Sequence, residues 1–268
     1  MKNLNIVGIG TKRFSQITLE SLEVLKSSEA ICFIETSEEL LKQYLPNTPK
    51  LVNLDPYYKT DRTDLENYKD MMKTILKTLD SHNNISFIVA GHPRLGVFLT
   101  KALETWGQAK NISVRVYEGI SSFDVMANTL QLDILENGTS IVDVNRALLF
   151  EHKLNTQCDH FFYHVCSVAN PVADYLGQHG GNRLDLLKNY LLNFYNQEHS
   201  IYLVKAANSS RESSQAIPYR LRDLDQLSEM IDFSTTLFIP AQKSSETNEE
   251  IMQIMKKAGV RREHQNLL

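Results

Sequence analysis

The chain has 268 residues, with 28 Lys and Arg against 32 Asp and Glu, which gives a net charge of -4. This balance, without a long basic run, argues against a nucleic-acid-binding protein, and the length allows one large or two modest domains. The three cysteines, Cys32, Cys158 and Cys166, lie in apolar or mixed segments, which is typical of reduced thiols rather than of a disulfide framework. Since no apolar stretch is long enough for a signal peptide or a membrane span, we expect a cytoplasmic protein with no membrane partner.

Strands and helices alternate through the first half of the chain. The expected strands are Leu4–Val7, Ala30–Ile34, Ile85–Ala90 and Val114–Tyr117. The expected helices are Thr18–Ser27, Thr63–Leu79, one near Gly96–Trp106 and one after Gly119. Among these, Thr63–Leu79 has the clearest start, because Thr63 and Glu66 have the spacing of a capping box. Such alternation predicts an α/β fold whose mostly parallel sheet carries helices on both faces.

The alternation breaks at Glu151–Asp159, where we place a domain boundary. The expected elements beyond it are the strands Phe161–Cys166, Ile201–Ala206, Ile217–Leu221 and Thr235–Ile239, and the helix Leu184–Phe194. A terminal helix is expected from Thr247, with Thr247 and Glu250 as a second capping box and Gly259 as its stop. The expected division is therefore a first domain at residues 1–154, a second at 155–242, and a C-terminal helix and tail at 243–268.

Three glycine-centred turns each follow an apolar run. They are Gly8-Ile9-Gly10, Gly91-His92-Pro93 and Gly119-Ile120-Ser121-Ser122. Parallel strands present their carboxyl ends at one edge of a sheet, which is where open α/β sheets bind ligands. The turns therefore predict a small-molecule pocket floored by backbone amides, with Ser121 and Ser122 as helix-capping or ligand-binding hydroxyls.

Other interpretations of these residues stay open. The first turn also fits the opening of a dinucleotide fold with Glu35 as the ribose-binding acid, although the third glycine of that pattern is replaced by Arg13. It also fits a turn with a purely structural role.

The sequence offers one tempting metal site. Cys158, His160, His164 and Cys166 share one face of an expected strand, but His160 and His164 would stand about 13 Å apart. The ligands of one zinc ion converge at about 2 Å from it, so we expect no metal.

In their order and content the three turns resemble the tetrapyrrole-methylase superfamily, whose members bind S-adenosylmethionine between two α/β domains. The matching segments are Val7-Gly8-Ile9-Gly10 followed by Ile17-Thr18-Leu19, then Gly91-His92-Pro93, then Glu118-Gly119-Ile120-Ser121-Ser122. The resemblance covers nearly the whole chain. It implies two α/β domains of this type, a cofactor cleft between them, S-adenosylmethionine as cofactor and S-adenosylhomocysteine as product.

His92 stands where the superfamily often has aspartate. In this respect the chain resembles the borosin-type peptide backbone N-methyltransferases in particular. Further similarities are Leu51-Val52-Asn53-Leu54 leading into Tyr57-Tyr58, the segment Ala206-Ala207-Asn208, and Ser234 through Ala241. By this resemblance Tyr58 and Tyr68 would match the catalytic tyrosines, and we hypothesise that the nearby Arg62 assists them electrostatically. The cofactor-binding residues would be Gly8, Gly10, Gly91, His92, Pro93, Val97, Phe98, Ser121, Ser122, Val165, Ala207, Ser234 and Thr235.

Two departures from the borosin pattern keep three functions in view. Asp64 stands where that branch usually has an arginine, and Ala90 where it tends to have a tyrosine. The first function is methylation of the backbone amides of a precursor peptide by a homodimer. We expect that peptide to be a separate chain, because no long acceptor tail follows Gly259. The second is methylation of a tetrapyrrole or other small molecule, and the third is a donor-binding scaffold without turnover. From the residues alone, Tyr68 also fits a packed core position on an apolar helix stripe.

Overall fold

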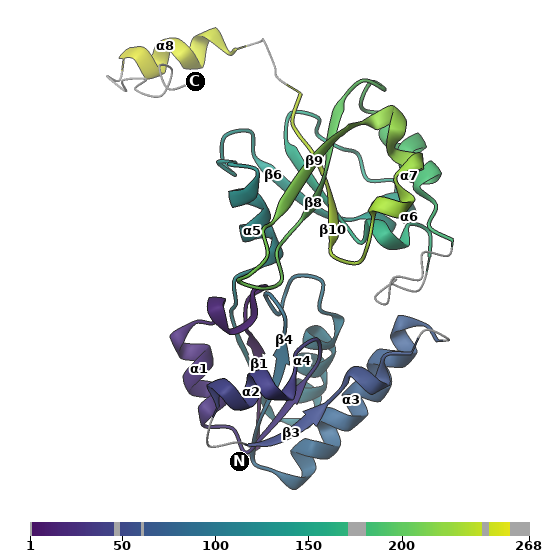
Figure 1. The fold of residues 1–268 in the computed structure, drawn as a ribbon. Coiled ribbons are helices and arrows are strands. Elements are labelled where there is room, and N and C mark those ends of the chain that lie inside the picture. The colour runs from purple at the N-terminus through teal and green to yellow at the C-terminus, as the bar shows by residue number, and fades with distance from the viewer. Residues whose placement is uncertain (1, 46–48, 60–61, 171–180, 243–246, 258–268) are drawn as a thin grey trace.

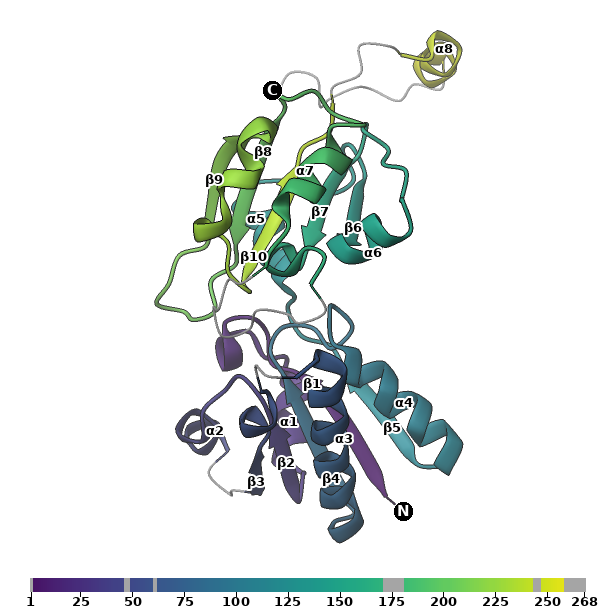
Figure 2. The same ribbon diagram turned by 90° about the vertical axis from the view of Figure 1, so that its right-hand side faces the viewer.

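The computed structural model describes residues 2–45, 49–59, 62–170, 181–242 and 247–257, and in them two five-stranded sheets form, one in each half of the chain. Figure 1 shows the two sheets as separate halves that follow one another along the chain. The view turned by 90° in Figure 2 shows the same two halves. The α/β fold with two such units is confirmed.

The first sheet is entirely parallel, with the order β3-β2-β4-β1-β5. Its strands are β1 (Asn3–Gly8), β2 (Ala30–Phe33), β3 (Lys50–Asn53), β4 (Asn84–Val89) and β5 (Ser113–Tyr117). The helices of this half are α1 (Leu19–Lys26), α2 (Glu38–Tyr44), α3 (Asp64–Ser81) and α4 (Phe98–Lys110). The predicted mostly parallel sheet is thus confirmed.

Alternate side chains of the central strands face opposite helical layers. Leu4 and Ile6 of β1 pack in a core with α3 and α4, whereas Val7 packs in a core with α1 and α2. Both faces of the sheet are therefore covered, which explains why its strands appear in the sequence as continuous apolar runs. The predicted capping box is formed by Thr63 and Glu66 at the start of α3.

The second sheet is mixed, with the order β6-β7-β10-β8-β9. Its strands are β6 (Thr139–Asp143), β7 (Asp159–Tyr163), β8 (Ser200–Lys205), β9 (Gln215–Arg220) and β10 (Thr235–Ile239). Only the pair β6 and β7 is parallel, and the other pairs are antiparallel. The helices that follow β5 are α5 (Ser122–Thr129), α6 (Val144–Leu149), α7 (Leu184–Leu191) and α8 (Glu249–Lys257).

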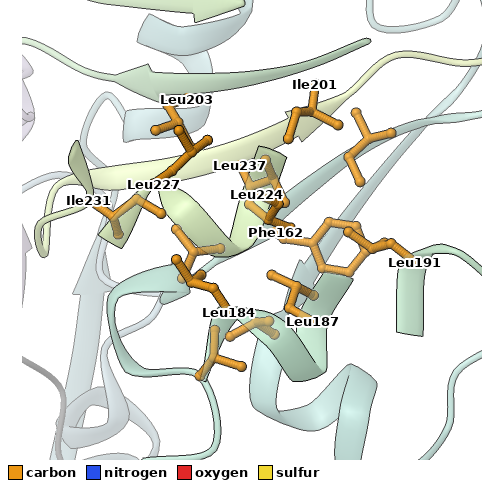
Figure 3. Close-up of a cluster of buried hydrophobic side chains, with 14 of the residues drawn as sticks. Phe162, Leu184, Leu187, Leu191, Ile201, Leu203, Leu224, Leu227, Ile231 and Leu237 are labelled. Atoms are coloured by element: carbon orange, nitrogen blue, oxygen red, sulfur yellow. The ribbon is translucent and has the colours of Figure 1, made fainter. Parts of the chain in front are cut away.

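The larger core of the second half lies between its sheet and α6 and α7. Figure 3 shows Phe162, Leu187 and Leu237 among the buried side chains gathered there. On the opposite face of the sheet, Met126 of α5 packs against Phe161 and Phe238. Helix α5 is therefore part of the second half, although it directly follows the last strand of the first sheet.

The change from one sheet to the other precedes the expected boundary at residue 154. Strand β6 pairs with β7, and α5 packs on the second sheet, so the two halves divide between β5 and α5. The sequence pattern conceals this point because β5 followed by α5 has the spacing of an ordinary strand–helix unit. The elements that the pattern missed are α2, β3, β6 and α6.

Among the element ends that differ from the expectation, two have a clear local cause. Strand β7 ends at Tyr163, because His164 adopts a left-handed backbone with φ 61°, and Val165–Ser167 form a short 3-10 helix. The N-cap of α8 is Asn248, whose side chain accepts from the Ile251 amide, rather than Thr247. The expected stop at Gly259 lies outside the described residues. Within those residues, the helices are too short or too polar to cross a membrane.

Candidate active site

The three glycine turns meet at the carboxyl edge of the first sheet. A Cβ atom on Gly8 would lie 2.7 Å from the Gly91 carbonyl oxygen, and one on Gly119 would lie 2.3 Å from the same oxygen. Both distances are far below a normal contact, so only glycine allows the three backbones to approach this closely. Gly91 itself has φ 73° and its oxygen accepts from the Gly10 amide. The turns thus form one tightly packed backbone unit.

A cavity of about 690 Å³ opens beside this unit, and residues from both halves line it. We call it the glycine-turn cavity. From the first half it is lined by Thr11, Arg13, Ile34, Glu35, Tyr58, Tyr68, Met71, Phe87, Val89 to His92 and Leu95 to Leu99. From the second half it is lined by Ser122, Tyr163, His164, Ala206, Asn208 and Asp232 to Thr236. Its volume is typical of small-molecule and cofactor sites.

Seven of the predicted cofactor-binding residues line this cavity: Gly91, His92, Val97, Phe98, Ser122, Ser234 and Thr235. The other six, Gly8, Gly10, Pro93, Ser121, Val165 and Ala207, are absent from its lining. Of these, Ser121 caps α5: its hydroxyl accepts from the Asp124 amide and donates to the Asp124 carboxylate. Val165 and Ala207 are buried, the former in the core of the second half.

The predicted tyrosines come together at one side of the cavity. The Tyr58 hydroxyl donates a hydrogen bond to Asp64, with Oη and Oδ1 2.7 Å apart. The Tyr68 ring meets the Tyr58 ring edge-on at a centroid distance of 6.4 Å, and stacks on Phe98 at 5.6 Å. Tyr58 comes from the loop after β3, Tyr68 from α3 and Phe98 from α4. Tyr68 is thus held between two rings and also faces the cavity.

Both phenols are kept protonated by their surroundings. Burial raises the pKa of Tyr68 to about 12, and the neighbouring carboxylates of Asp64 and Glu35 add to this rise. Burial also raises the pKa of Tyr58, together with its hydrogen bond to Asp64. Near neutral pH both side chains therefore present a hydroxyl rather than a phenolate.

Arg62, the third predicted catalytic residue, lies elsewhere. Its guanidinium Nη1 contacts the Asp70 carboxylate at 2.9 Å, and the arginine is absent from the cavity lining. Asp70 also accepts from Lys73, so this cluster belongs to the solvent-facing side of α3. The structure does not bring Arg62 to the two tyrosines.

Several polar side chains in the cavity were not predicted as site residues. Tyr163 and Ser122 share a hydrogen bond of 3.1 Å, and burial raises the pKa of Tyr163 to about 12. The His164 imidazole lies 2.7 Å from the Asp143 carboxylate. The sequence pattern carried no signal for Tyr163 and His164, because the expected strand Phe161–Cys166 placed both inside a strand rather than at its end.

Asp232 organises the loop that carries Ser234 and Thr235. Its carboxylate accepts from Lys205 at 2.6 Å and from the hydroxyls of Ser234 and Thr235 at 2.6 and 2.9 Å. Burial raises the pKa of Asp232, but these hydrogen bonds outweigh burial and hold it at about 2. The two predicted hydroxyls thus fix the loop, and Asp232 places a carboxylate beside the cavity.

Two more lining residues have unusual backbones. Arg13 and Glu35 both have φ 57°, a left-handed conformation that is rare for residues with a side chain. Burial raises the pKa of the Glu35 carboxyl, which the Arg13 charge opposes. Strained residues of this kind concentrate at functional sites.

A second, larger cavity of about 1540 Å³ adjoins the tyrosines. We call it the α6–α7 cavity, because residues of both helices line it, among them Leu148, Leu149, Leu186, Asn189 and Tyr190. It shares Tyr68, Gly96, Phe98, His164 and Phe233 with the glycine-turn cavity, and Asp64 also lines it. The Tyr58–Asp64 pair therefore lies where the two cavities meet.

The dinucleotide interpretation fits this geometry poorly. Such folds begin a helix directly at the glycine turn, so that its N-terminus faces the pyrophosphate. Here a 3-10 helix at Arg13–Gln16 follows the turn, and α1 begins only at Leu19. The Gln16 side chain accepts from Thr11 and from the Lys12 amide, so it occupies those donors.

The residues considered for a metal are engaged separately. His160 contacts the Asn155 carbonyl and His164 contacts Asp143, at opposite ends of β7. Within the described ranges no group of three or more histidine, cysteine and carboxylate side chains could hold a metal ion.

The fold and site define a two-sheet α/β protein whose ligand cavity lies at the carboxyl edge of a parallel sheet, beside three packed glycine turns of which Gly91 lines the cavity. Residues 3–225 match the family model of the Tetrapyrrole (Corrin/Porphyrin) Methylases. The chain belongs to this family, as the resemblance of its three turns predicted.

Two relatives named as borosin or cyclic peptide precursors match this chain at low identity. A methyltransferase and type I borosin cyclic peptide precursor of Cerrena unicolor is 23% identical over 96% of this chain and 63% of its own length. A methyltransferase and lentinulin A precursor of Lentinula edodes is 22% identical over 95% of this chain and 61% of its own length. The chain thus spans about three-fifths of these relatives.

Solved structures of similar fold include two methyltransferases. Uroporphyrin-III-C-methyltransferase from Thermus thermophilus superposes with a TM-score of 0.61 at 15% identity, over 89% of this chain and 92% of that one. The methyltransferase CobJ superposes with a TM-score of 0.58 at 14% identity, over 92% and 98%. At these identities the likeness concerns the fold.

Proposed function

We propose that this protein is an S-adenosylmethionine-dependent methyltransferase that N-methylates backbone amides of a separate peptide. The observation that carries the proposal is the position of Tyr58 and Tyr68 where two cavities meet, one sized for a nucleoside and one larger. Family membership supports methyl transfer, and the two borosin relatives support a peptide as acceptor.

The glycine-turn cavity suits the methyl donor. Its backbone floor at Gly91 offers polar groups without side-chain bulk, and Val97 and Phe98 supply apolar surface. The carboxylates of Glu35 and Asp232 line the same space and favour a ligand with hydroxyls and a positive charge. These features fit S-adenosylmethionine, which when bound supplies an electrophilic methyl group on a sulfonium.

The acceptor would lie in the α6–α7 cavity. Its volume of about 1540 Å³ exceeds the usual range of small-molecule pockets, and its wall is mixed, with leucine, asparagine and tyrosine side chains. Such a wall can take an extended chain that presents amides and apolar side chains together. Because this cavity shares Tyr68 and Phe98 with the donor cavity, an acceptor in it would reach the donor at the tyrosines.

The two tyrosines would position and polarise the acceptor amide. An amide nitrogen is a poor nucleophile, so the site must stabilise the negative charge that develops on the amide oxygen as the N–H proton leaves and the nitrogen attacks the methyl group. A protonated Tyr68 can donate a hydrogen bond to that oxygen, and its ring is held in place by Phe98 and Tyr58. Alignment of donor and acceptor and exclusion of water would supply much of the remaining acceleration. Arg62, paired with Asp70, has no part in this proposal.

The test is mass spectrometry after incubation with S-adenosylmethionine. The acceptors are the product of the reading frame next to the gene and synthetic apolar peptides with blocked ends, which can be methylated only on backbone amides. We expect the peptides to gain mass in steps of one methyl group and fragmentation to place each methyl on a backbone nitrogen. Methylation of the chain itself, or of none of the peptides, would contradict the proposal.

A small-molecule acceptor is the second candidate, and Asp64 and Ala90 favour it. Both depart from the borosin pattern, and both line a cavity. Uroporphyrinogen III in the same assay tests this candidate, since two of the structures of similar fold are uroporphyrin-III C-methyltransferases, one of them in complex with S-adenosylhomocysteine. A donor-binding scaffold without turnover would bind S-adenosylhomocysteine in calorimetry and methylate none of these compounds.

We also propose that the protein acts as a homodimer, as the borosin resemblance implies, and that it works in the cytoplasm. Light scattering of the purified protein tests the dimer directly. A mass of one chain at micromolar concentration would remove the dimer from the proposal and leave the chemistry intact.

A further inference from the structure

The proposed reaction leaves one proton without a destination. Methylation of an amide nitrogen forms an N–C bond and breaks the donor S–C bond, and the N–H proton must then leave. Both phenols at the site are protonated, because burial raises the pKa of Tyr58 and of Tyr68. A protonated phenol can take a second proton only if it hands its own proton to another group at the same time.

The structure supplies such a group beside Tyr58. The Tyr58 hydroxyl donates to Asp64 at 2.7 Å, so its O–H bond is directed at the carboxylate and its oxygen lone pairs lie away from it. Tyr58 lines the glycine-turn cavity and Asp64 lines the α6–α7 cavity. The pair therefore spans the place where the proposed donor and acceptor meet.

Other carboxylates of the glycine-turn cavity are less suited. Asp232 accepts from Lys205, Ser234 and Thr235, and these hydrogen bonds hold it ionised. Glu35 follows β2, and the Arg13 charge acts on its carboxyl. By contrast, Asp64 is half-buried, and its bonded partner is itself a proposed reacting side chain.

We propose that Tyr58 and Asp64 form a proton relay, in which Tyr58 takes the acceptor N–H proton as it passes its own hydroxyl proton to Asp64. The inference rests on the proposed methyl transfer. In the balanced step the positive sulfonium becomes a neutral thioether, the nitrogen keeps its bond to the new methyl, and the negative Asp64 becomes a neutral acid that later loses its proton to solvent. Asp64 acts through Tyr58 and is thus a positioning and proton-accepting residue.

The test compares Asp64→Asn with Asp70→Asn on the same helix. Asparagine keeps an oxygen that can accept from Tyr58 but cannot take up the proton, so a merely structural role of Asp64 would survive the change. With a peptide that the wild type methylates, we expect kcat of Asp64→Asn to fall about 100-fold, with KM and the affinity for S-adenosylhomocysteine little changed. Asp64→Glu should recover part of the rate, and Asp70→Asn should behave as wild type.

A double-mutant cycle adds a sharper measurement. If Tyr58 and Asp64 act as one unit, Tyr58→Phe combined with Asp64→Asn should be no slower than Tyr58→Phe alone. Multiplicative losses would overturn the relay.

A second readout needs neither donor nor acceptor. In protein with isotope-labelled tyrosine Cζ, the Tyr58 resonance is identified by its loss in Tyr58→Phe. Asp64→Asn should move that resonance, because the hydroxyl then bonds a neutral amide, and Asp70→Asn should leave it unmoved.

The outcomes separate the two proposals. A wild type that methylates no peptide overturns the proposed function and the relay with it. An active wild type with Asp64→Asn within threefold of its rate, or with an unmoved Tyr58 resonance, overturns the relay alone.

Discussion

Tyr68 combines features of a packed residue and of a reacting one. Its ring is stacked on Phe98 and met edge-on by Tyr58, yet it lines both cavities. Burial raises its pKa to about 12, so it can donate a hydrogen bond over the whole physiological range of pH. Packing thus serves to fix the direction in which the hydroxyl points.

Replacing Tyr68 by phenylalanine separates these two features. The ring stays, so we expect affinity for S-adenosylhomocysteine in calorimetry to change less than threefold, while the methylation rate falls about 100-fold. Tyr57→Phe is the control, because Tyr57 is absent from the linings of both cavities. An unchanged rate in Tyr68→Phe would return Tyr68 to a packing role.

Arg62→Ala should have little effect on the reaction. The guanidinium pairs with Asp70 at the surface, and exposed ion pairs contribute about 0–1 kcal/mol to stability. We therefore expect a methylation rate within threefold of wild type and a small shift in urea unfolding. A loss comparable to that of Tyr68→Phe would mean that Arg62 reaches the tyrosines during turnover.

For individual residues, part of the site could be predicted from the sequence. The glycine turns and Tyr58 with Tyr68 were predictable, because strand ends and a family spacing mark them. The contact of Tyr58 with Asp64 was not, because it depends on how the loop after β3 folds back onto the first turn of α3. Tyr163 and His164 were also not predicted as site residues, because only the formation of the second sheet brings them to the cavity.

The glycine turns show how backbone packing at one element shapes the cavity. In Gly119→Ala the new methyl group would lie 2.3 Å from the Gly91 oxygen, so one of the turns must shift. We expect a loss of about 1–3 kcal/mol in urea unfolding and weaker binding of S-adenosylhomocysteine. Ile120→Ala in the same turn is the control, because Ile120 is 40% exposed and its backbone needs no change. Equal behaviour of the two variants would contradict this account.

The loop before β10 should depend on pH through Asp232. Burial raises the pKa of Asp232, but hydrogen bonds from Lys205, Ser234 and Thr235 depress it to about 2. A carboxylate with a depressed folded-state pKa stabilises the fold above its unfolded pKa, and this stability is lost as pH falls from about 4 to about 2.

Asp232→Asn measures this contribution. Because the side chain is 45% exposed, solvent screening limits the stabilisation to about 1 kcal/mol. Urea unfolding should show the variant less stable than wild type at neutral pH and equal to it near pH 2. An equal difference in unfolding free energy between wild type and variant at both pH values would mean that the ionised carboxylate is not its source.

The elements differed in how well they could be predicted. Helix α3 has an 18-residue amphipathic stripe and a capping box, so its type and start were evident. Strand β3 has four residues, all at least partly exposed, and its pattern carries little apolar signal. Strand β6 was missed for a similar reason, because Ile141 is 45% exposed. Without β6, the pattern carries no sign that the second sheet begins before residue 154.

For the whole molecule, a ligand in the glycine-turn cavity would contact both halves. Saturation at 100 times Kd stabilises a protein by about 2.7 kcal/mol if the ligand binds only the folded state. Trp106 on α4 is the single tryptophan of the chain, so its fluorescence reports on the first half alone, whereas circular dichroism reports on both. With saturating S-adenosylhomocysteine we expect the midpoint temperatures of both melting curves to rise and to coincide. A higher midpoint temperature in tryptophan fluorescence alone would mean that the ligand contacts only the first half.

The proposed reacting side chains, Tyr58, Asp64 and Tyr68, occupy one short stretch between β3 and the second turn of α3. The glycine turns beside the neighbouring cavity come from other strands. Substitutions in this stretch can therefore change the groups that would handle an acceptor amide while the packed turns keep their backbone. A protein divided in this way can acquire new acceptor chemistry without rebuilding that backbone.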